Sequence, residues 1–253
     1  MLSMCLWCVL PFTACGGGKA NSATPLSGNW QMTLTRDQTS SIRILSGFLL
    51  QSQSSLTGNL LLSGETNCAG VGSASGNVKG SNLTLTVAET GQTVNLTGSA
   101  SSDGTSMNGS YSIYSSPCGG TQTGSWTGTQ VRALQGNLRG TFTSTYPTYN
   151  GQTFQFIGMI AQAANTGGSA ANLSGNITTE NPCFGAASVS GQISGTAVVL
   201  NLVSDENVAM GKINGTMTVD AASITGDYRI FNAETPAVGG CQDYGTATIT
   251  LQQ

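Results

Sequence analysis

Apolar and polar residues alternate along most of the chain with a period of two. In residues 82–87 (NLTLTV), the apolar positions Leu83, Leu85 and Val87 alternate with polar ones. This alternation predicts β-strands that bury one face and expose the other. The same pattern predicts strands in the first half of the chain that begin at residues 29, 42, 55, 70, 82, 93, 106 and 121. No segment has a convincing helical period.

Turn signals separate the predicted strands. Glycine-rich and Asp-Gly segments, such as residues 102–105 (SDGT), recur between them and favour antiparallel hairpins. Short strands that follow one another in this way favour a closed up-and-down barrel, because closure removes the exposed strand edges. Only 8% of the residues are charged, so the chain has few charges with which to protect an open edge.

An internal duplication is the strongest signal in the sequence. Residues 95–114 (NLTGSASSDGTSMNGSYSIY) align without a gap on residues 212–231 (KINGTMTVDAASITGDYRIF). The alignment pairs Gly98 with Gly215, Asp103 with Asp220, Gly109 with Gly226, and Tyr111 with Tyr228. We infer that the chain carries two copies of one unit.

A second alignment marks where each copy begins, because residues 28–35 (GNWQMTLT) match residues 136–143 (GNLRGTFT). We therefore predict an all-β chain with two tandem eight-stranded antiparallel up-and-down β-barrels, over residues 28–131 and 132–253. A single sixteen-stranded outer-membrane barrel is less favoured. It would need an apolar band with aromatic girdles, and 6% of the residues are aromatic.

The N-terminal segment, residues 1–14, is apolar and has no charged side chain. It is too short to span a bilayer as a helix of about 20 residues, but long enough for the apolar region of an export signal. Residues 12–15 (FTAC) resemble the lipobox of bacterial lipoproteins. This resemblance implies that residues 1–14 are a signal peptide and that Cys15 is lipidated. Residues 15–27 then form a flexible tether to the membrane.

The localisation follows from the same resemblance. Gly16 comes after Cys15, and in similar lipoproteins this permits sorting to the outer membrane. We expect an exported protein, anchored to the bacterial outer membrane by its N-terminal lipid. An ordinary cleaved signal peptide beside an unrelated cysteine is the alternative.

Composition agrees with export and narrows the range of partners. The net charge is −3, the chain has no histidine, and glycine accounts for 35 of 253 residues. Such a chain has no basic patch, so we do not expect a nucleic-acid partner.

Four of the seven cysteines lie outside the N-terminal region: Cys68, Cys118, Cys183 and Cys241. An even number in an exported chain favours disulfides. Spacing alone leaves the pairing open. The duplication favours one bridge within each copy, Cys68 with Cys118 and Cys183 with Cys241, and pairing between the copies is the alternative.

A family resemblance appears at the first strand. Residues 28–30 (GNW) resemble the G-x-W motif of lipocalins and avidins. In these families the tryptophan closes one end of an eight-stranded barrel and a late arginine stacks on it. The resemblance implies these roles for Trp30 and Arg132, whereas the second copy has Leu138 in place of the tryptophan. It implies architecture and names no ligand.

The chain offers little for catalysis, because it lacks histidine, the commonest general base and metal ligand. The acid pairs that merit attention are Glu65 with Glu180 and Asp205 with Glu206, whereas Asp103 and Asp220, at matching turns, could in principle bind Ca²⁺. Each is more simply interpreted as a turn or hairpin-tip residue. We expect no enzyme activity, no metal and no cofactor.

Two classes of function remain. The first is a binding module that encloses one small apolar ligand in a barrel. The second is a structural or adhesive surface lipoprotein whose barrels are filled by their own side chains. The aromatic residues that would line a cavity or a core are Trp30, Tyr111, Tyr114, Trp126, Tyr228 and Phe231. The inward glycines allow either internal space or strong coiling of the strands.

Overall fold

The computed structural model describes residues 24–64, 69–114, 120–205, 209–232 and 241–252. In these segments the chain forms sixteen β-strands and no α-helix. Accordingly, this part of the chain contains no helix that could cross a membrane.

Barrel 1 is a meander of eight antiparallel strands that closes where the last strand pairs with the first. Its strands are β1 (Gly28–Arg36), β2 (Ile42–Ser52), β3 (Ser55–Ser63), β4 (Gly70–Lys79), β5 (Asn82–Glu89), β6 (Gln92–Ala100), β7 (Ser106–Tyr114) and β8 (Gln122–Val131). The strand starts expected from the alternation differ from these by at most one residue.

Barrel 2 repeats this topology and closes through pairing of β16 with β9. Its strands are β9 (Gly136–Ser144), β10 (Thr153–Gln162), β11 (Ala171–Thr179), β12 (Ala186–Ser194), β13 (Ala197–Ser204), β14 (Ala209–Met217), β15 (Ser223–Asn232) and β16 (Cys241–Gln252). The prediction of two tandem eight-stranded barrels is confirmed, and the sixteen-stranded alternative is wrong.

Glycines inside the strands allow the tight coiling that closure requires. A Cβ atom at Gly109 would lie 1.9 Å from the carbonyl oxygen of Thr97 and 2.6 Å from the Cα of Gly98 on the neighbouring strand. The inward glycines therefore serve close approach of backbones, one of the two roles left open by the sequence. The indole N–H of Trp126, which pairs with Gly109 across β7 and β8, donates to the carbonyls of Thr97 (3.2 Å) and Ser110 (3.1 Å).

Equivalent hydrogen bonds confirm the duplication. The backbone N–H of Leu26 donates to Oε1 of Gln51 at the end of β2 (2.6 Å). In the second copy the backbone N–H of Leu134 donates to Oε1 of Gln162 at the end of β10 (3.0 Å). The segment that precedes each barrel is thus fixed to the second strand of that barrel in the same way.

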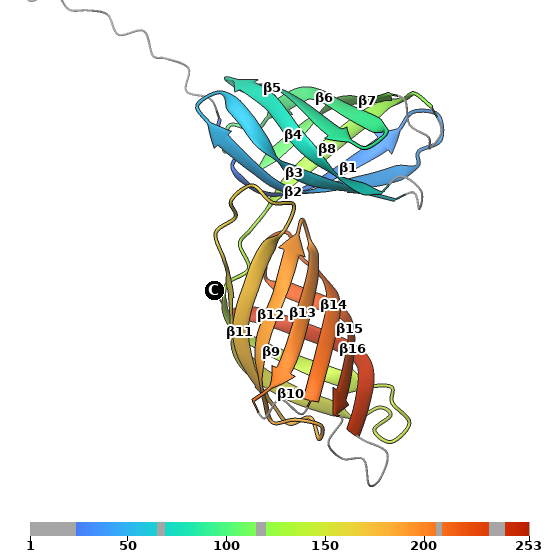
Figure 1. The fold of residues 1–253 in the computed structure, drawn as a ribbon, viewed down its shortest axis with the longest axis vertical. Coiled ribbons are helices and arrows are strands. Elements are labelled where there is room, and N and C mark those ends of the chain that lie inside the picture. Colours follow the sequence, from blue (N-terminus) through green and yellow to red (C-terminus); the bar gives the residue numbers. More distant parts are fainter. Residues whose placement is uncertain (1–23, 65–68, 115–119, 206–208, 233–240, 253) are drawn as a thin grey trace, which may run out of the picture.

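The two barrels lie crossed, with one side of barrel 1 against one end of barrel 2 (Figure 1). Phe48 projects from the outer wall of β2, is 4% exposed, and belongs to the hydrophobic core of barrel 2. Asn29 on β1 forms two hydrogen bonds of 2.8 Å with Gly195 in the β12–β13 turn, one to the carbonyl oxygen and one from the backbone N–H. Gln31 accepts a third, from the backbone N–H of Thr196.

The two copies close this end of the barrel differently. In barrel 1, Trp30 is fully buried and its indole N–H donates to the carbonyl of Leu26 (2.9 Å). In barrel 2 the aligned residue is the smaller Leu138, and Phe48 of barrel 1 packs into the same core cluster. A side chain from the first barrel therefore completes the second. Arg132, expected to stack on Trp30, is exposed and lies in the linker between the barrels.

We predict that replacing the two aligned asparagines, Asn29 and Asn137, lowers the free energy of unfolding by different amounts, because Asn29 bonds to Gly195 across the interface. Asn29→Ala would leave the buried N–H and carbonyl of Gly195 without their partner, which lowers the free energy of unfolding by about 1–3 kcal/mol. Urea unfolding monitored by fluorescence measures this loss. Asn137→Ala, at the aligned and exposed position in barrel 2, is the matched control and should have little effect. Equal losses in the two variants would contradict this account of the interface.

Candidate functional site

Buried side chains fill the interiors of both barrels, and the core of barrel 2 includes Phe48 of barrel 1. A lumen that admitted water would leave solvent-accessible area on the side chains that line it. The inward-facing side chains that are at most 1% exposed include, in barrel 1, Trp30, Leu34, Leu45, Leu60, Leu96 and Trp126 and, in barrel 2, Phe142, Ile193, Val198, Ile213, Ala247 and Ile249. These side chains belong to two buried core clusters, one in each barrel. Tyr111 and Tyr228, at 4% and 3% exposed, belong to the same cores.

The copies reach this packing with different residues. In barrel 2, the ring of Phe142 stacks on that of Phe156, with centroids 4.4 Å apart, and contacts the ring of Tyr228 at 4.5 Å. The ring of Phe156 also occupies the space that a side chain at Gly140 would need. Barrel 2 has smaller residues at the positions of the tryptophans, since Leu138 aligns with Trp30, and Ala247 pairs with Gly226 where Trp126 pairs with Gly109.

A buried carboxylate lies at the end of barrel 2 that carries the disulfide, which we call the mouth of barrel 2. Asp243 is 0% exposed and accepts hydrogen bonds from three side chains. Its donors are the hydroxyl of Ser144 (2.5 Å), Nδ2 of Asn181 (2.6 Å) and the hydroxyl of Tyr228 (2.7 Å). Three donors satisfy a carboxylate that has been removed from water. Burial, with help from the hydrogen bond to Asp243, raises the pKa of Tyr228 well above its ordinary value.

The disulfide closes the mouth of barrel 2. Cys183, between β11 and β12, bonds to Cys241 at the start of β16, as predicted for this copy. The adjacent turn is tied to the carboxylate, because Asn181 accepts from the backbone N–H of Cys183 (3.0 Å) while it donates to Asp243. The bridge closes a loop of 58 residues, which stabilises the fold by roughly 4 kcal/mol on the chain-entropy model. The predicted partners in the first copy, Cys68 and Cys118, lie outside the described residues.

Barrel 1 has polar side chains at the corresponding end, but with a different charge. Arg43 is 2% exposed there, and Gln92 donates from Nε2 to Oε2 of Glu89. Burial raises the pKa of Glu89, and the Gln92 hydrogen bond and the positive charge of Arg43 oppose this effect. The corresponding ends of the two barrels thus both bury polar side chains, with Arg43 in barrel 1 and Asp243 in barrel 2.

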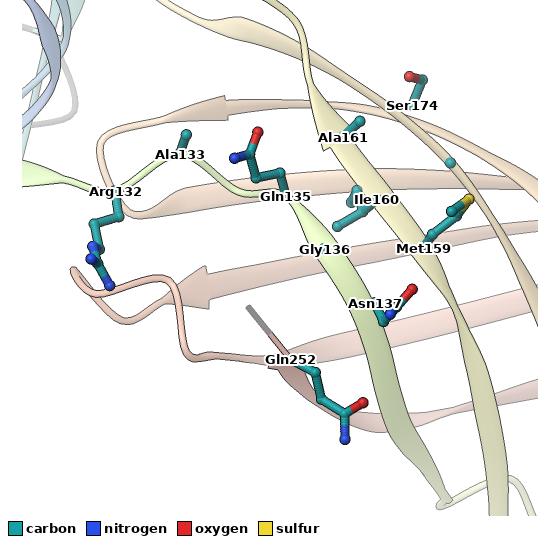
Figure 2. Close-up of a pocket in the computed structure, with 11 residues that line it drawn as sticks. Arg132, Ala133, Gln135, Gly136, Asn137, Met159, Ile160, Ala161, Ser174 and Gln252 are labelled. Atoms are coloured by element: carbon teal, nitrogen blue, oxygen red, sulfur yellow. The ribbon is translucent and has the colours of Figure 1, made fainter.

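A groove lies outside the barrels, beside the linker that joins them (Figure 2). It has a volume of about 790 Å³. Its lining residues are Arg132, Ala133, Gln135, Gly136, Asn137, Met159, Ile160, Ala161, Ser174, Gly175 and Gln252. Asn137 on β9 and Met159 on β10 are cross-strand partners, and Met159 is 52% exposed, so this groove belongs to the outer wall.

The groove combines one cation with neutral polar and apolar side chains. Arg132 supplies a guanidinium group, and its backbone N–H donates to the carbonyl of Val219 (2.9 Å). Its charge also reaches Asp220, whose pKa is lowered first by hydrogen bonds from Thr218 and Ala222 and then by Arg132. A volume of this size suits a small molecule, although the groove is open on one side.

The acidic residues suggested by the sequence do not form a catalytic pair in the described structure. Glu180 and Asp205 are exposed in different turns, while Glu65 and Glu206 lie outside the described residues. No group of three or more His, Cys, Asp or Glu side chains that could hold a metal occurs in the part of the chain that the structure describes.

Asp103 and Asp220 stabilise equivalent turns. Asp103 accepts from the Ser101 hydroxyl and from the backbone N–H of Thr105, and these hydrogen bonds lower its pKa. Asp220 accepts in the same way from the backbone N–H of Ala222 (3.1 Å). Their geometry agrees with the turn interpretation given above.

Sequence reasoning missed the Asp243 cluster. Asp243 directly follows Cys241 and Gln242, and no motif marks its carboxylate as buried. Its position in phase with the inward side chains of β16 was the one available signal, because Ala247, Ile249 and Leu251 share that face.

Cys15, the predicted lipidation site, lies outside the described residues.

Comparison with known proteins does not assign the chain to a family: no family model matches it, and no curated protein matches it in sequence.

Because the pKa of Tyr228 is raised in the folded protein, we predict that the protein loses stability at alkaline pH. Below the ordinary tyrosine pKa of about 10 both folded and unfolded chains hold this proton, so Tyr228 adds no pH dependence there. Above it only the unfolded chain releases the proton, because the folded pKa is raised, and the free energy of unfolding falls by about 1.4 kcal/mol per pH unit.

Urea unfolding of the wild type and of Tyr228→Phe at pH 7 and pH 11 measures this effect. The variant should be less stable at pH 7, because it loses the hydrogen bond to Asp243, and the difference should shrink at pH 11. Tyr114→Phe, which alters an exposed ring, is the control. A difference that stays the same at both pH values would contradict the prediction.

Proposed function

We propose that this chain is a non-catalytic lipoprotein of the bacterial cell envelope that acts through the outer walls of its barrels. The filled interiors carry this proposal, because Trp30 and Trp126 in barrel 1 and Phe142 in barrel 2 occupy the space in which a lipocalin-like barrel would hold its ligand. Of the two classes of function that the sequence leaves open, the structural or interaction class is better supported.

The membrane attachment is proposed from residues 12–15 (FTAC), whose resemblance to a lipobox makes Cys15 the acceptor of the lipid. The disulfide between Cys183 and Cys241 supports it indirectly, because such bridges persist in oxidising compartments outside the cytoplasm. We propose the outer membrane as the site of attachment, on the basis of Gly16.

The proposed lack of catalysis is supported by composition and geometry together. The chain has no histidine. Asp243, which is fully buried, directs its carboxylate at Ser144, Asn181 and Tyr228 within the fold rather than at solvent. We assign this cluster to stability.

The outer groove favours a second candidate function, the binding of a small molecule. Its volume of about 790 Å³ falls within the usual range for ligand sites. Met159 provides an apolar surface there, and Arg132 and Asn137 provide donors. Such a ligand would lie outside the barrel, unlike the enclosed apolar ligand that the lipocalin resemblance suggests.

Replacement of the proposed lipid acceptor tests the anchor. Cys15→Ser should leave the chain unprocessed by lipoprotein signal peptidase and move it from the detergent phase to the aqueous phase in Triton X-114 partitioning. Cys8→Ser, which removes a cysteine from the signal peptide, should behave like the wild type. Membrane retention of Cys15→Ser equal to that of the wild type would refute lipidation at this residue.

Native mass spectrometry of the purified full chain tests where any small molecule binds. We expect either no retained molecule or one that is lost in Ala161→Trp, a change that fills the outer groove and leaves the barrel interior unaltered. Ala88→Trp, at an exposed position on β5 of barrel 1, is the control. A molecule retained in Ala161→Trp would place the ligand elsewhere and contradict the outer-groove assignment.

A further inference from the structure

Three tyrosines form an exposed cluster beside the mouth of barrel 2, which we call the tyrosine platform. Tyr146 and Tyr149 lie in the β9–β10 loop, residues 145–152, and Tyr244 projects from the outer face of β16. The ring of Tyr146 lies 5.4 Å from that of Tyr244, edge to face, and 6.1 Å from that of Tyr149. Tyr244 is 39% exposed and the other two are half-buried.

The platform is held firmly. The backbone N–H of Thr145 donates to the carbonyl of Tyr244 (2.8 Å), and that of Tyr146 donates to the hydroxyl of Ser144 (3.1 Å). The same hydroxyl donates to the buried Asp243, so the loop is joined to the carboxylate cluster. Rings fixed in this way lose little conformational entropy when a ligand binds.

Charged side chains of both signs lie next to the platform on the outer wall. Arg229 on β15 is the cross-strand partner of Tyr244, and Lys212 on β14 is the partner of Arg229. Asp227 shares the outer face with Arg229, two residues earlier on the strand, and all three charged residues are exposed. Like charges placed directly opposite one another destabilise a sheet, so the Lys212–Arg229 pair does not favour the fold.

Barrel 1 provides an internal control for this surface. The register aligns the pair Tyr111–Gly124 with the pair Tyr228–Gly245. The residues that correspond to Lys212, Arg229 and Tyr244 are therefore Asn95, Ser112 and Thr123, which form an equivalent cross-strand row. The loop that corresponds to residues 145–152 is residues 37–41 (DQTSS), which has no aromatic residue. The same closed barrel thus forms without any of these side chains.

We propose that the tyrosine platform, together with Arg229, Lys212 and Asp227, is a binding site for a saccharide. An exposed tyrosine ring offers an apolar face to the C–H face of a sugar and a hydroxyl to its polar edge. The planar guanidinium of Arg229 and the carboxylate of Asp227 supply a donor and an acceptor for neighbouring sugar hydroxyls.

The charges favour this occupant over an anionic membrane surface. Membrane attraction increases with each lysine or arginine close to the lipid. Here Asp227 lies beside the two cations, and Asp205 is exposed in the turn that follows β13. The mixture suits a ligand with many hydroxyls, which needs both donors and acceptors.

Isothermal titration of the purified full chain with chitotetraose, cellotetraose and trigalacturonic acid tests the proposal. We expect at least one of them to bind with a Kd of about 1 mM or tighter. Tyr244→Thr and Arg229→Ser, which install the residues of barrel 1, should each weaken that binding by about tenfold, and Tyr244→Phe should retain most of it. Tyr114→Thr, which removes an exposed tyrosine from barrel 1, should leave the affinity unchanged.

Three results would overturn the proposal. The first is that none of the three saccharides binds. The second is that binding is unchanged in both Tyr244→Thr and Arg229→Ser while the urea unfolding midpoints match the wild type. The third is that the Cys15→Ser chain sediments with phosphatidylglycerol vesicles and loses this property in Arg229→Ser, which would make the surface a membrane contact. The saccharide proposal does not depend on the lipid anchor. If saccharide binding fails, the proposed lipidation of Cys15 is unaffected.

Discussion

Closure of each sheet on itself is the constraint on which the structure depends. An eight-stranded barrel has room for its own side chains and little more, so the strands must coil tightly and the interior volume must match. Glycine at positions such as Gly109 permits the close approach of neighbouring backbones, and Trp126 donates to two carbonyls on these strands. Closure also pairs every strand with two neighbours, so none of the sixteen strands has an open edge. This matters because the chain has few charges with which to protect such an edge.

The two copies satisfy this constraint in different ways. Barrel 1 fills its interior with two tryptophans, whereas barrel 2 uses Phe142 and Phe156 and takes Phe48 from the outer wall of its neighbour. Barrel 2 is therefore complete only when barrel 1 is docked against it. This contact joins the pair of barrels into one structural unit.

The polar end of each barrel shows the same divergence. Arg43 lies at this end of barrel 1, and Asp243, held by three donors, lies at the mouth of barrel 2 beneath the Cys183–Cys241 bridge. The Asp243 cluster connects the disulfide, the β9–β10 loop and the barrel wall. It thereby fixes the tyrosines on the outside of the barrel, so that a buried carboxylate contributes to the geometry of an exposed surface.

Sequence by itself determined the strands, the turns and the duplication, and the duplication favoured the bridge that the structure shows in the second copy. These features are periodic or local, and two copies of one pattern reinforce each other, so strand starts such as those of β2, β3 and β4 agreed with the structure. The apolar run of β2 (IRILSGFLL), with hydrophobic residues on both faces, was a signal that its outer wall would also be covered.

Only the tertiary structure decided what the outer wall of β2 contacts and which polar residues are buried. Asn29 and Gly195 are 166 residues apart and meet because the side of one barrel seats on the end of the other. In the sequence, Asp243 resembles any other acidic residue near a turn. Closure of the barrel brings Ser144, Asn181 and Tyr228 around it. Alternation along a strand specifies which face a side chain occupies, but the distance between remote strands depends on how the whole sheet curls and docks.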